Sequence, residues 1–595
     1  MSLGLVLDIA KTALAAQKYA LNVTGHNIAN VNTPGYSRQS PIMEAQEPST
    51  YAGKVMGRGV LMNQIVRVCD QFIEDRLMQE KSGMFSSQEM ENYMQILESS
   101  FNENSTTSIS SILSDFWNMW HDISNNPSGV PERIALYEHS ILLAEQFNKL
   151  DADLGQMTTD LTAAVSVGIE KANEITAEIA QLNDKIVRME ANSSANDLWD
   201  MRNTLISELS EYLDVKTFAQ DNGSLTVVTA MGYILVHANT SFDLQMGGAG
   251  GDQEQWLGSN GETVDITDYI ASGKMGGWLD MRDEIVAKYN LNLDAVVKEF
   301  TWTVNQQHSQ GIGRAGFTSV TGTYSATAPA AAITASGLSY QDKVDDSNKT
   351  FKIWLYDTNG DPYDSDLVTA GLQGNPITIT VTSGMTINEL VTAIDNGTGV
   401  QASLDSQNRV TISINTGEIA TLGSLAFSED NSNVLAALGI NTFFQGAGAG
   451  SISINSVISN KDYIATAQID ANGNYTAGDN SNALAMIDLQ YASTAIAQWT
   501  CDRINGNTQG SITTTIEGYY HAMAGSIGIT SAGISSARAF NEAMVNKLSN
   551  IRDSISAVSL DEEMVNLVKF QHAYTAAAKL VSVADEMMAT LLQIK

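Results

Sequence analysis

The stretch ANVNTPGYSRQ, residues 29–39, interrupts a helical pattern that has barely begun. Before it, large aliphatic residues recur every seven positions, a spacing typical of one face of a helix. These residues are Leu7, Leu14, Leu21 and Ile28. Pro34 disfavours the helical conformation of Thr33, and Gly35 supplies a turn. The sequence therefore predicts a terminal helix that ends at a tight turn.

This turn motif combines small, polar and aromatic side chains. Its members are Asn27, Asn30, Asn32, Thr33, Pro34, Gly35 and Tyr36. Because asparagine side chains readily hydrogen-bond nearby backbone groups, the three asparagines are expected to brace the turn; plain solvation is the alternative. Beside the heptad positions, Ala13, Ala16 and Ala20 would let another helix approach closely.

The other end of the chain predicts a second long helix. Ser559 followed by Glu562 is a capping-box signature, and apolar residues then form two adjacent stripes. The residues expected to make contacts are Met564, Leu567, Phe570, Tyr574, Leu580, Val581, Met587, Met588, Leu591 and Leu592. Two stripes form a face too wide for one partner helix, and such a face favours association.

We therefore expect the two terminal helices to pair as a coiled coil and to find further cover in other copies of the chain. An isolated helix pair is marginal, since ordering costs about 1–2 kcal/mol per residue, so the ends are expected to order on assembly. Packing of both helices onto the neighbouring domain as ordinary core stays open as the alternative.

Between the ends, the period of the apolar residues changes along the chain. Helical spacing predicts a helix that begins near Cys69 and runs past Met94, further helices near 109–123, 131–147, 161–189 and 281–307, and helix again after about 482. A hairpin is predicted around Asp221-Asn222-Gly223, and residues 315–455 are rich in strand and turn signals with one short helix in GMTINELVTAI. The fold class is thus multidomain α+β, with a helical bundle built from both chain ends and a β-rich insertion.

This pattern predicts three parts. They are a terminal helical domain of residues 1–35 with 556–595, a mainly helical domain of 36–314 with 456–555 that carries a β-hairpin region near 215–270, and an inserted β-rich domain of 315–455.

Composition excludes several classes of protein. The 595 residues carry a formal net charge of −35, which repels nucleic acid and anionic lipid, so neither is an expected partner. Cys69 and Cys501 form neither a disulfide framework nor a metal motif. Asp8 and Lys11 interrupt the N-terminal apolar run, so a cleaved signal peptide is not expected.

Candidates for catalysis are few. His121 and His139 lack ligand partners at metal spacing, and His308 is better explained as a hydrogen-bonded residue at a helix end. Glu562 and Glu563 lie at the predicted start of a helix, where the helix dipole stabilises negative charge. This explains the two carboxylates better than general acid–base catalysis does. DTNGD, residues 357–361, favours a hairpin turn over a calcium loop, because Val368 stands where a bidentate glutamate is needed. We expect no catalytic, cofactor or metal residues.

Both ends of the chain resemble one known family. LNVTGHNIANVNTPGYSRQ and SLDEEMVNLVKFQHAYTAAAKLVSVADEMMATLLQIK are similar to the end signatures of the bacterial flagellar rod, hook and hook-associated proteins. Internal segments such as DLWDMRNTLISELSEYLDV and LAALGINTFFQGA look most like the members that join the hook to the filament. The likeness spans most of the chain and is weakest at about 315–430.

The resemblance implies a structural subunit that is exported through the flagellar type III apparatus and works outside the cell, after a transient cytoplasmic stage. The partners it implies are further copies in a ring-like tier, the hook protein, a second junction protein and a cytoplasmic export chaperone that binds the C-terminal helix. The alternatives are a hook or rod protein of the same family and, in other classes, a secreted adhesin or a wall-lytic enzyme.

Overall fold

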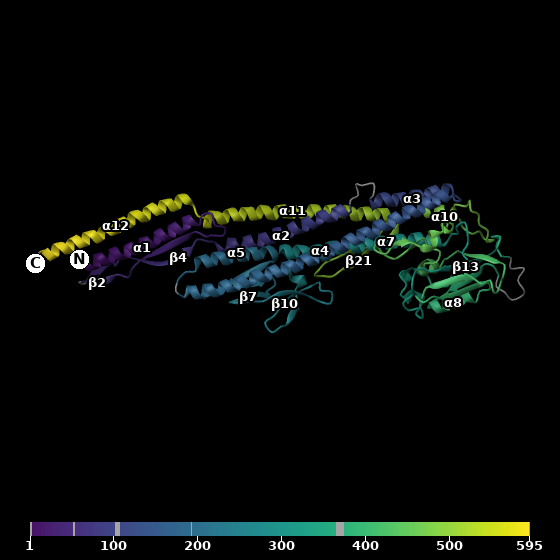
Figure 1. Ribbon diagram of the computed structural model, residues 1–595, viewed down its shortest axis with the longest axis horizontal. Coiled ribbons are helices and arrows are strands. Elements are labelled where there is room, and N and C mark those ends of the chain that lie inside the picture. Colours follow the sequence, from purple (N-terminus) through teal and green to yellow (C-terminus); the bar gives the residue numbers. More distant parts are fainter. Residues whose placement is uncertain (1–2, 52–53, 102–107, 192, 364–373, 594–595) are drawn as a thin grey trace. The chain divides into compact units, whose positions relative to one another are not determined.

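The computed structural model describes residues 3–51, 54–101, 108–191, 193–363 and 374–593, and it has the expected mixed α+β architecture (Figure 1). The chain divides into two compact units. Unit 1 comprises Met1–Tyr93, Asp160–Met281 and Ser531–Lys595, and unit 2 comprises Met94–Thr159 and Arg282–Thr530. The three-part division expected from the sequence stays a prediction.

The terminal helices of unit 1 pack against each other, as predicted. α1 (Leu3–Ala29) and α12 (Leu560–Gln593) lie side by side and run antiparallel (Figure 1). The buried side chains of this pair are mainly small: Ala10, Ala16, Ala20, Val23, Ala577 and Ala584. The predicted heptad residues of α1 are only half-buried. The seam between the helices is therefore narrow, and larger apolar side chains flank it.

After α1 the chain forms short antiparallel strands and then returns to helix. The strands are β1 (Gln39–Ala45), β2 (Ser49–Tyr51), β3 (Lys54–Met56) and β4 (Val60–Arg67), paired β1 with β4 and β2 with β3. α2 (Gln71–Ser100) follows, and its unit 1 part contacts α11 (Ile516–Ser556). Arg538 of α11 is ion-paired with Glu91 of α2, and the Asn541 amide lies 3.3 Å from the Ser87 hydroxyl.

α4 (Val130–Glu190) is one helix of 61 residues, where the sequence predicted two separate segments. Gly168, which breaks the apolar series, lies inside the helix and is buried. A Cβ at this position would lie 2.9 Å from a ring carbon of Trp278 and 3.0 Å from Met275 Cγ. Glycine is therefore required here by close packing rather than by a helix end.

Replacing Gly168 with alanine is expected to lower the free energy of unfolding, because overpacking costs about 1–3 kcal/mol and outweighs the gain of about 1 kcal/mol from removing a helical glycine. The control is Gly533→Ala in the same unit, where nothing lies within 4 Å of the added carbon; it should stabilise. Urea unfolding of both variants measures the difference. Equal stabilisation of the two would contradict the packing role.

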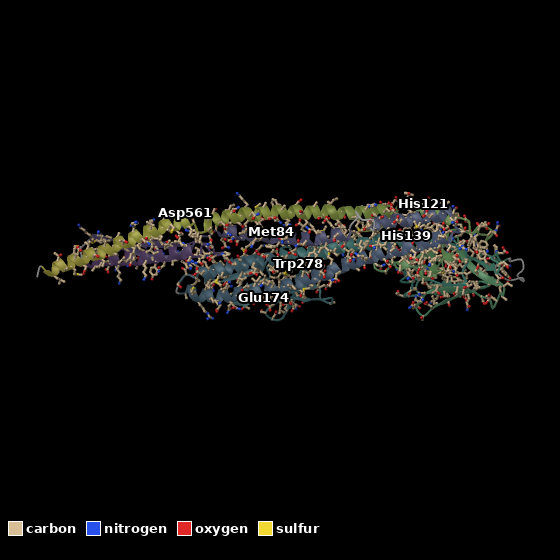
Figure 2. The ribbon with its side chains drawn as sticks, turned by 45° about the horizontal axis from the view of Figure 1, so that its top comes forward. Met84, His121, His139, Glu174, Trp278 and Asp561 are labelled. Carbon is tan, nitrogen blue, oxygen red and sulfur yellow. The ribbon has the colours of Figure 1, made fainter. Side chains whose placement is uncertain are left out.

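The rest of unit 1 consists of α5 (Asn196–Tyr212), α6 (Gly273–Leu279) and two small antiparallel sheets. The first sheet has the order β5-β6-β7-β8 and contains the predicted hairpin; its strands are Val215–Ala219, Leu225–Thr229, Ile234–His237 and Thr240–Ser241. The second has the order β11-β10-β9, with strands Thr263–Asp265, Gln253–Leu257 and Leu244–Gly247. Trp278 of α6, labelled in Figure 2, donates to the Glu89 carboxylate at 3.0 Å.

Unit 2 has a core of aromatic residues between helices. α3 (Ile109–Asn125), the first part of α4, and α7 (Ala287–Ser309) contribute to it, and a π-helical turn (Asp280–Val286) precedes α7. The rings in mutual contact are those of Phe116, Trp117, Trp120, Phe147, Phe300, Phe443 and Phe444. Such pairs each add about 0.5–1.5 kcal/mol beyond the apolar area they bury.

The β-rich part of unit 2 contains two three-stranded antiparallel sheets, with the orders β12-β16-β15 and β14-β13-β17. Their strands are β12 (Ser319–Thr321), β13 (Lys349–Asp357), β14 (Ile377–Val381), β15 (Val400–Leu404), β16 (Val410–Ile414) and β17 (Leu422–Ser428). The predicted short helix is α8 (Ile387–Asp395), and Thr386 with Glu389 caps it in a complete capping box. α9 (Val434–Leu438) and the paired β18 (Phe444–Gln445) and β19 (Ser453–Ile454) follow.

The expectation of helix from residue 482 onward is wrong in part. α10 (Ser481–Asp488) is followed by a hairpin of β20 (Thr494–Thr500) and β21 (Thr508–Thr514) before α11 begins. β21 is almost wholly exposed and carries one large apolar residue, Ile512. It therefore lacks the alternation of apolar and polar residues by which a half-buried strand is predicted.

His308 is a buried, neutral hydrogen-bonding residue next to the end of α7, as its sequence context suggested. Its Nδ1 lies 2.8 Å from the Asn441 carbonyl, and its Nε2 accepts from the Ala465 amide at 3.0 Å. Burial lowers the pKa of His308 to about 4, from its ordinary value near 6.5.

This pKa predicts an acid-dependent loss of stability. Between about pH 6.5 and 4 the unfolded chain binds a proton that the folded chain does not, so the free energy of unfolding falls as pH falls, by about 3 kcal/mol in total. His308→Gln should flatten that slope in urea unfolding at pH 7, 5.5 and 4.5, whereas the exposed His521→Gln should not. An unchanged slope in His308→Gln would contradict the assignment.

Candidate assembly site at the terminal helices

The turn motif folds around one buried amide. The amide nitrogen of Asn27 donates to the Gln39 carbonyl at 2.9 Å and lies 3.2 Å from the Glu563 carboxylate. Its oxygen accepts from the Gln39 amide at 3.0 Å and from the Tyr36 hydroxyl at 2.8 Å. Every hydrogen-bonding position of this side chain is occupied. Asn27 thus connects α1, β1 and α12.

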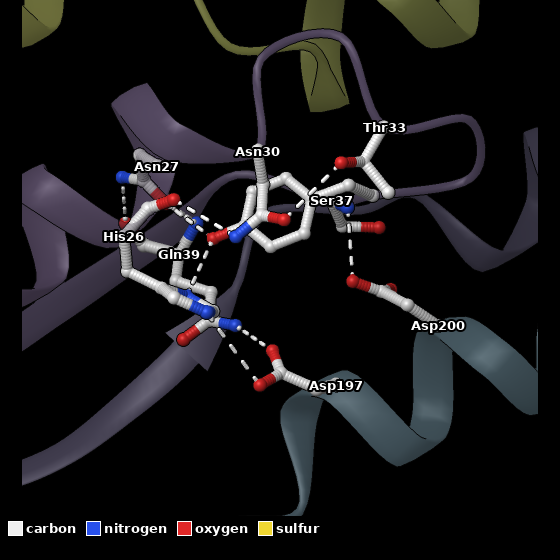
Figure 3. Close-up of polar contacts among 9 residues, drawn as sticks. His26, Asn27, Asn30, Thr33, Ser37, Gln39, Asp197 and Asp200 are labelled. Carbon is white, nitrogen blue, oxygen red and sulfur yellow. Dashed lines mark hydrogen bonds and ion pairs between the residues drawn. The ribbon is translucent and has the colours of Figure 1, made fainter.

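Asn30 and Thr33 hold the loop closed (Figure 3). Asn30 donates to the His26 carbonyl at 3.0 Å and accepts from the Thr33 hydroxyl at 3.1 Å. Gly35 has a φ of 77°, a left-handed conformation that favours glycine. Burial, together with nearby carboxylates, raises the pKa of the Tyr36 hydroxyl, which keeps it protonated as a donor to Asn27.

Two aspartates of α5 accept hydrogen bonds from the residues that follow the turn (Figure 3). Asp200 accepts from the Ser37 amide at 2.9 Å and from Arg67 at 2.8 Å. Asp197 accepts from the Gln39 side chain at 2.7 Å. The direction of the chain after the turn is therefore set by side chains about 160 positions away in the sequence.

An ion-pair cluster joins this turn to the start of α12. Arg38 Nε lies 2.9 Å from Glu563, and its Nη1 lies 2.9 Å from Glu562. Glu563 is buried, with 2 % of its side chain exposed, whereas Glu562 is mostly exposed. The Arg38 amide also donates to the Ser556 carbonyl at 2.9 Å. Asn27, Arg38, Glu562 and Glu563 form what we call the terminal junction.

Beyond the terminal junction, α12 exposes large apolar side chains. Val565 is 68 % exposed and Met587 is 50 % exposed. We define the outer apolar face of α12 by five exposed residues: Val565, Val568, Leu580, Val583 and Met587. Exposed large apolar side chains in this number on one helix are typical of interaction surfaces.

The residues predicted from the sequence divide between the two sides of α12. Met564, Tyr574, Leu580, Met587, Met588 and Leu592 are exposed, whereas Leu567, Phe570 and Val581 are half-buried. The side chain of Leu591 lies outside the described part of the chain. In the turn, Asn32, Thr33, Pro34 and Gly35 are exposed. An assembly role for these residues is a proposal.

Sequence reasoning missed several residues of this region. Arg38, Glu563, Asp197 and Asp200 act across long sequence separations, and only the opposite charges in SRQ and DEEM hinted at the ion pair. Val565, Val568 and Val583 were also missed. Their three- and four-residue spacing to other apolar residues was the available signal.

Chemistry other than assembly finds little support among the described residues. In that part of the chain, no group of three or more His, Cys, Asp or Glu could hold a metal ion, and no helix is long and apolar enough to cross a membrane. His121 and His139 lie on α3 and α4 (Figure 2). The Asp357 carboxylate accepts from the backbone amides of Asn359 and Asp361, which makes DTNGD a turn.

Four family models match the sequence. The flagellar hook-associated protein FlgK helical domain matches residues 94–321, and the flagellin hook IN motif matches 366–416. The flagella basal body rod protein model matches 7–36, and the flagellar basal body rod FlgEFG protein C-terminal model matches 553–594. The two rod models cover α1 with its turn and α12, the elements that the terminal junction connects.

Full-length relatives agree with these matches. The chain is 25 % identical to flagellar hook-associated protein 1 of Escherichia coli over 99 % of its own length and 100 % of the relative. It is 23 % identical to flagellar hook-associated protein 1 of Bacillus subtilis, over 98 % of its own length and 96 % of the relative. The structure of the flagellar hook junction protein FlgK from Burkholderia pseudomallei shares the fold, with a TM-score of 0.52 at 15 % identity over 81 % of this chain and 100 % of that one. Along its whole length, the chain is thus similar to flagellar hook-associated protein 1.

Proposed function

We propose that this chain is a structural, non-enzymatic subunit of the bacterial flagellum, and that it joins the hook to the filament outside the cell. The observation that carries the proposal is the outer apolar face of α12. It lies on a helix that the terminal junction fastens to α1, in a chain whose relatives of equal length are hook-associated proteins.

The energetics favour assembly through this face. Full burial of one large apolar side chain is worth about 1.5–3 kcal/mol. Five such residues stay exposed in the single chain because the contact of α12 with α1 uses mainly small side chains. Neighbouring copies that cover Val565, Val568, Leu580, Val583 and Met587 would therefore gain several kcal/mol for each subunit.

We propose four partners for the terminal domain of residues 1–35 with 556–595, which would line the central channel. These are further copies in a ring-like tier, the hook protein, a second junction protein and an export chaperone. The chaperone is proposed for the outer apolar face because this surface needs cover in the cytoplasm before export through the type III apparatus.

Electron microscopy of a deletion strain tests the proposed position. Hooks without filaments, with filament protein shed into the medium, are expected, and the full-length chain should restore the filaments. Absent hooks would instead indicate a hook or rod protein of the same family. A strain with normal filaments would overturn the structural role altogether.

A further inference from the structure

A second polar cluster of unit 1 takes no part in the contact between α1 and α12. A cavity of about 160 Å³ lies between α2, α5 and the β5–β6 hairpin. Arg67, at the end of β4, and Arg202, on α5, both line it. Gln71, Asn203 and Ser207 add polar groups to its wall.

Both arginines are buried and incompletely paired. Arg67 keeps 8 % of its side chain exposed, donates from Nη1 to Asp200 at 2.8 Å and stacks on the Trp199 ring. Arg202 donates from Nη1 to the Asn183 side chain at 2.8 Å and to the Gly223 carbonyl at 3.0 Å. The Nε atom of each arginine is buried without a hydrogen-bond partner. Such a donor carries a desolvation cost of about 1–3 kcal/mol.

Arg202 also lacks a counter-ion. Its two partners are neutral, and within the described ranges no carboxylate lies within 4.0 Å of it. Burial and the charge of Arg67 lower the pKa of Arg202 to about 10, so it stays charged at neutral pH. Glu74 lines the same cavity, and burial raises the pKa of its carboxyl group.

We propose that this cavity binds a small oxyanion such as inorganic phosphate, which pairs with the guanidinium groups of Arg67 and Arg202, the two arginines that line it. The N–H groups of a guanidinium match the spacing of two oxygens of a phosphate or carboxylate, so these anions pair with it through two parallel hydrogen bonds. The cavity has room for several waters, and hence for a tetrahedral oxyanion. A bound oxyanion would fasten α2, α5 and the β5–β6 hairpin to one another.

Thermal unfolding in potassium phosphate against potassium chloride, at equal ionic strength, tests the site in the full chain. The structure predicts a saturable rise in Tm with phosphate, because the ligand binds only the folded state. If chloride raises Tm by the same amount and also saturates, a halide ion stabilises the protein as well as phosphate does. That result would overturn the oxyanion assignment.

Ala219 supplies a matched pair of variants that spares the buried arginines. It is an exposed residue that lines the cavity, so Ala219→Glu adds a competing carboxylate while Ala219→Gln adds a neutral side chain of the same size. The phosphate-dependent shift should disappear in the first and persist in the second. General stabilisation by phosphate acts on both alike, so equal shifts in the two variants would overturn the site.

Hydrogen exchange locates the effect. In the wild-type chain, phosphate should slow amide exchange in residues 67–78 and 199–207, which contribute most of the cavity wall. Slowing spread evenly over both units, with no excess in these segments, would contradict the proposal even if the Tm rises.

Discussion

Replacing Arg38 with glutamate is expected to abolish filament attachment. The substitution removes the partner of the buried Glu563 carboxylate and places a third negative charge beside Glu562 and Glu563. Loss of one member of a buried ion pair costs about 3–5 kcal/mol, which is large against the few kcal/mol that hold a helix pair together. Swimming in soft agar and filament counts by electron microscopy measure the result.

The control is Lys547→Glu, which makes the same change of charge at an exposed position of α11 and should leave swimming near wild type. Hydrogen exchange of residues 560–575 in the purified chain should accelerate in Arg38→Glu only. The exchanged pair Arg38→Glu with Glu563→Arg should recover part of the function. Normal filaments in the Arg38→Glu strain would contradict the role given to the terminal junction.

Replacing Met587 with aspartate is expected to abolish assembly without unfolding the single chain. Met587 is half exposed, and substitutions at exposed positions usually change stability by less than about 0.5 kcal/mol. In the flagellum the same carboxylate would be buried without a partner in every copy, which costs several kcal/mol each time. Tm should stay unchanged while filaments are lost.

Ser582→Asp adds the same charge at an exposed position of α12 that is already polar, so it serves as the comparison. It should reduce filament number far less than Met587→Asp does. If both variants carry normal filaments, neither copies of the chain nor other axial proteins cover the outer apolar face.

The elements predicted from the sequence are those with a strong periodic signal. Seven-residue spacing in α1, 3–4 spacing in α3 and α12, and Asn-Gly turn chemistry in the β5–β6 hairpin each encode their structure locally. The β20–β21 hairpin was missed because β21 is nearly all polar and exposed. The unbroken course of α4 was missed because residues 148–160 are mostly polar, although Leu150, Leu154 and Met157 continue the buried side of the helix through them.

The site was predictable only in part, for the same physical reason. Exposed apolar side chains such as Leu580 and Met587 could be predicted, because the helical spacing shows that α12 carries more apolar residues than one partner helix can cover. The contact between Arg38 and Glu563 joins residues 525 positions apart, and no local pattern specifies it. Asn27 was expected to bind backbone, which it does at Gln39, but its contact with Glu563 depends on the antiparallel pairing of the helices.

The central claim is that the outer apolar face of α12 is uncovered in the single chain and covered in the flagellum. Thiol labelling of Val568→Cys, in a Cys69→Ser background that retains the buried Cys501, tests it most directly. The account predicts fast maleimide labelling of the purified monomer and strong protection in isolated hook–filament complexes, while Ala584→Cys, buried against α1, is protected in both. Equal labelling of Val568→Cys in the two states would contradict the account.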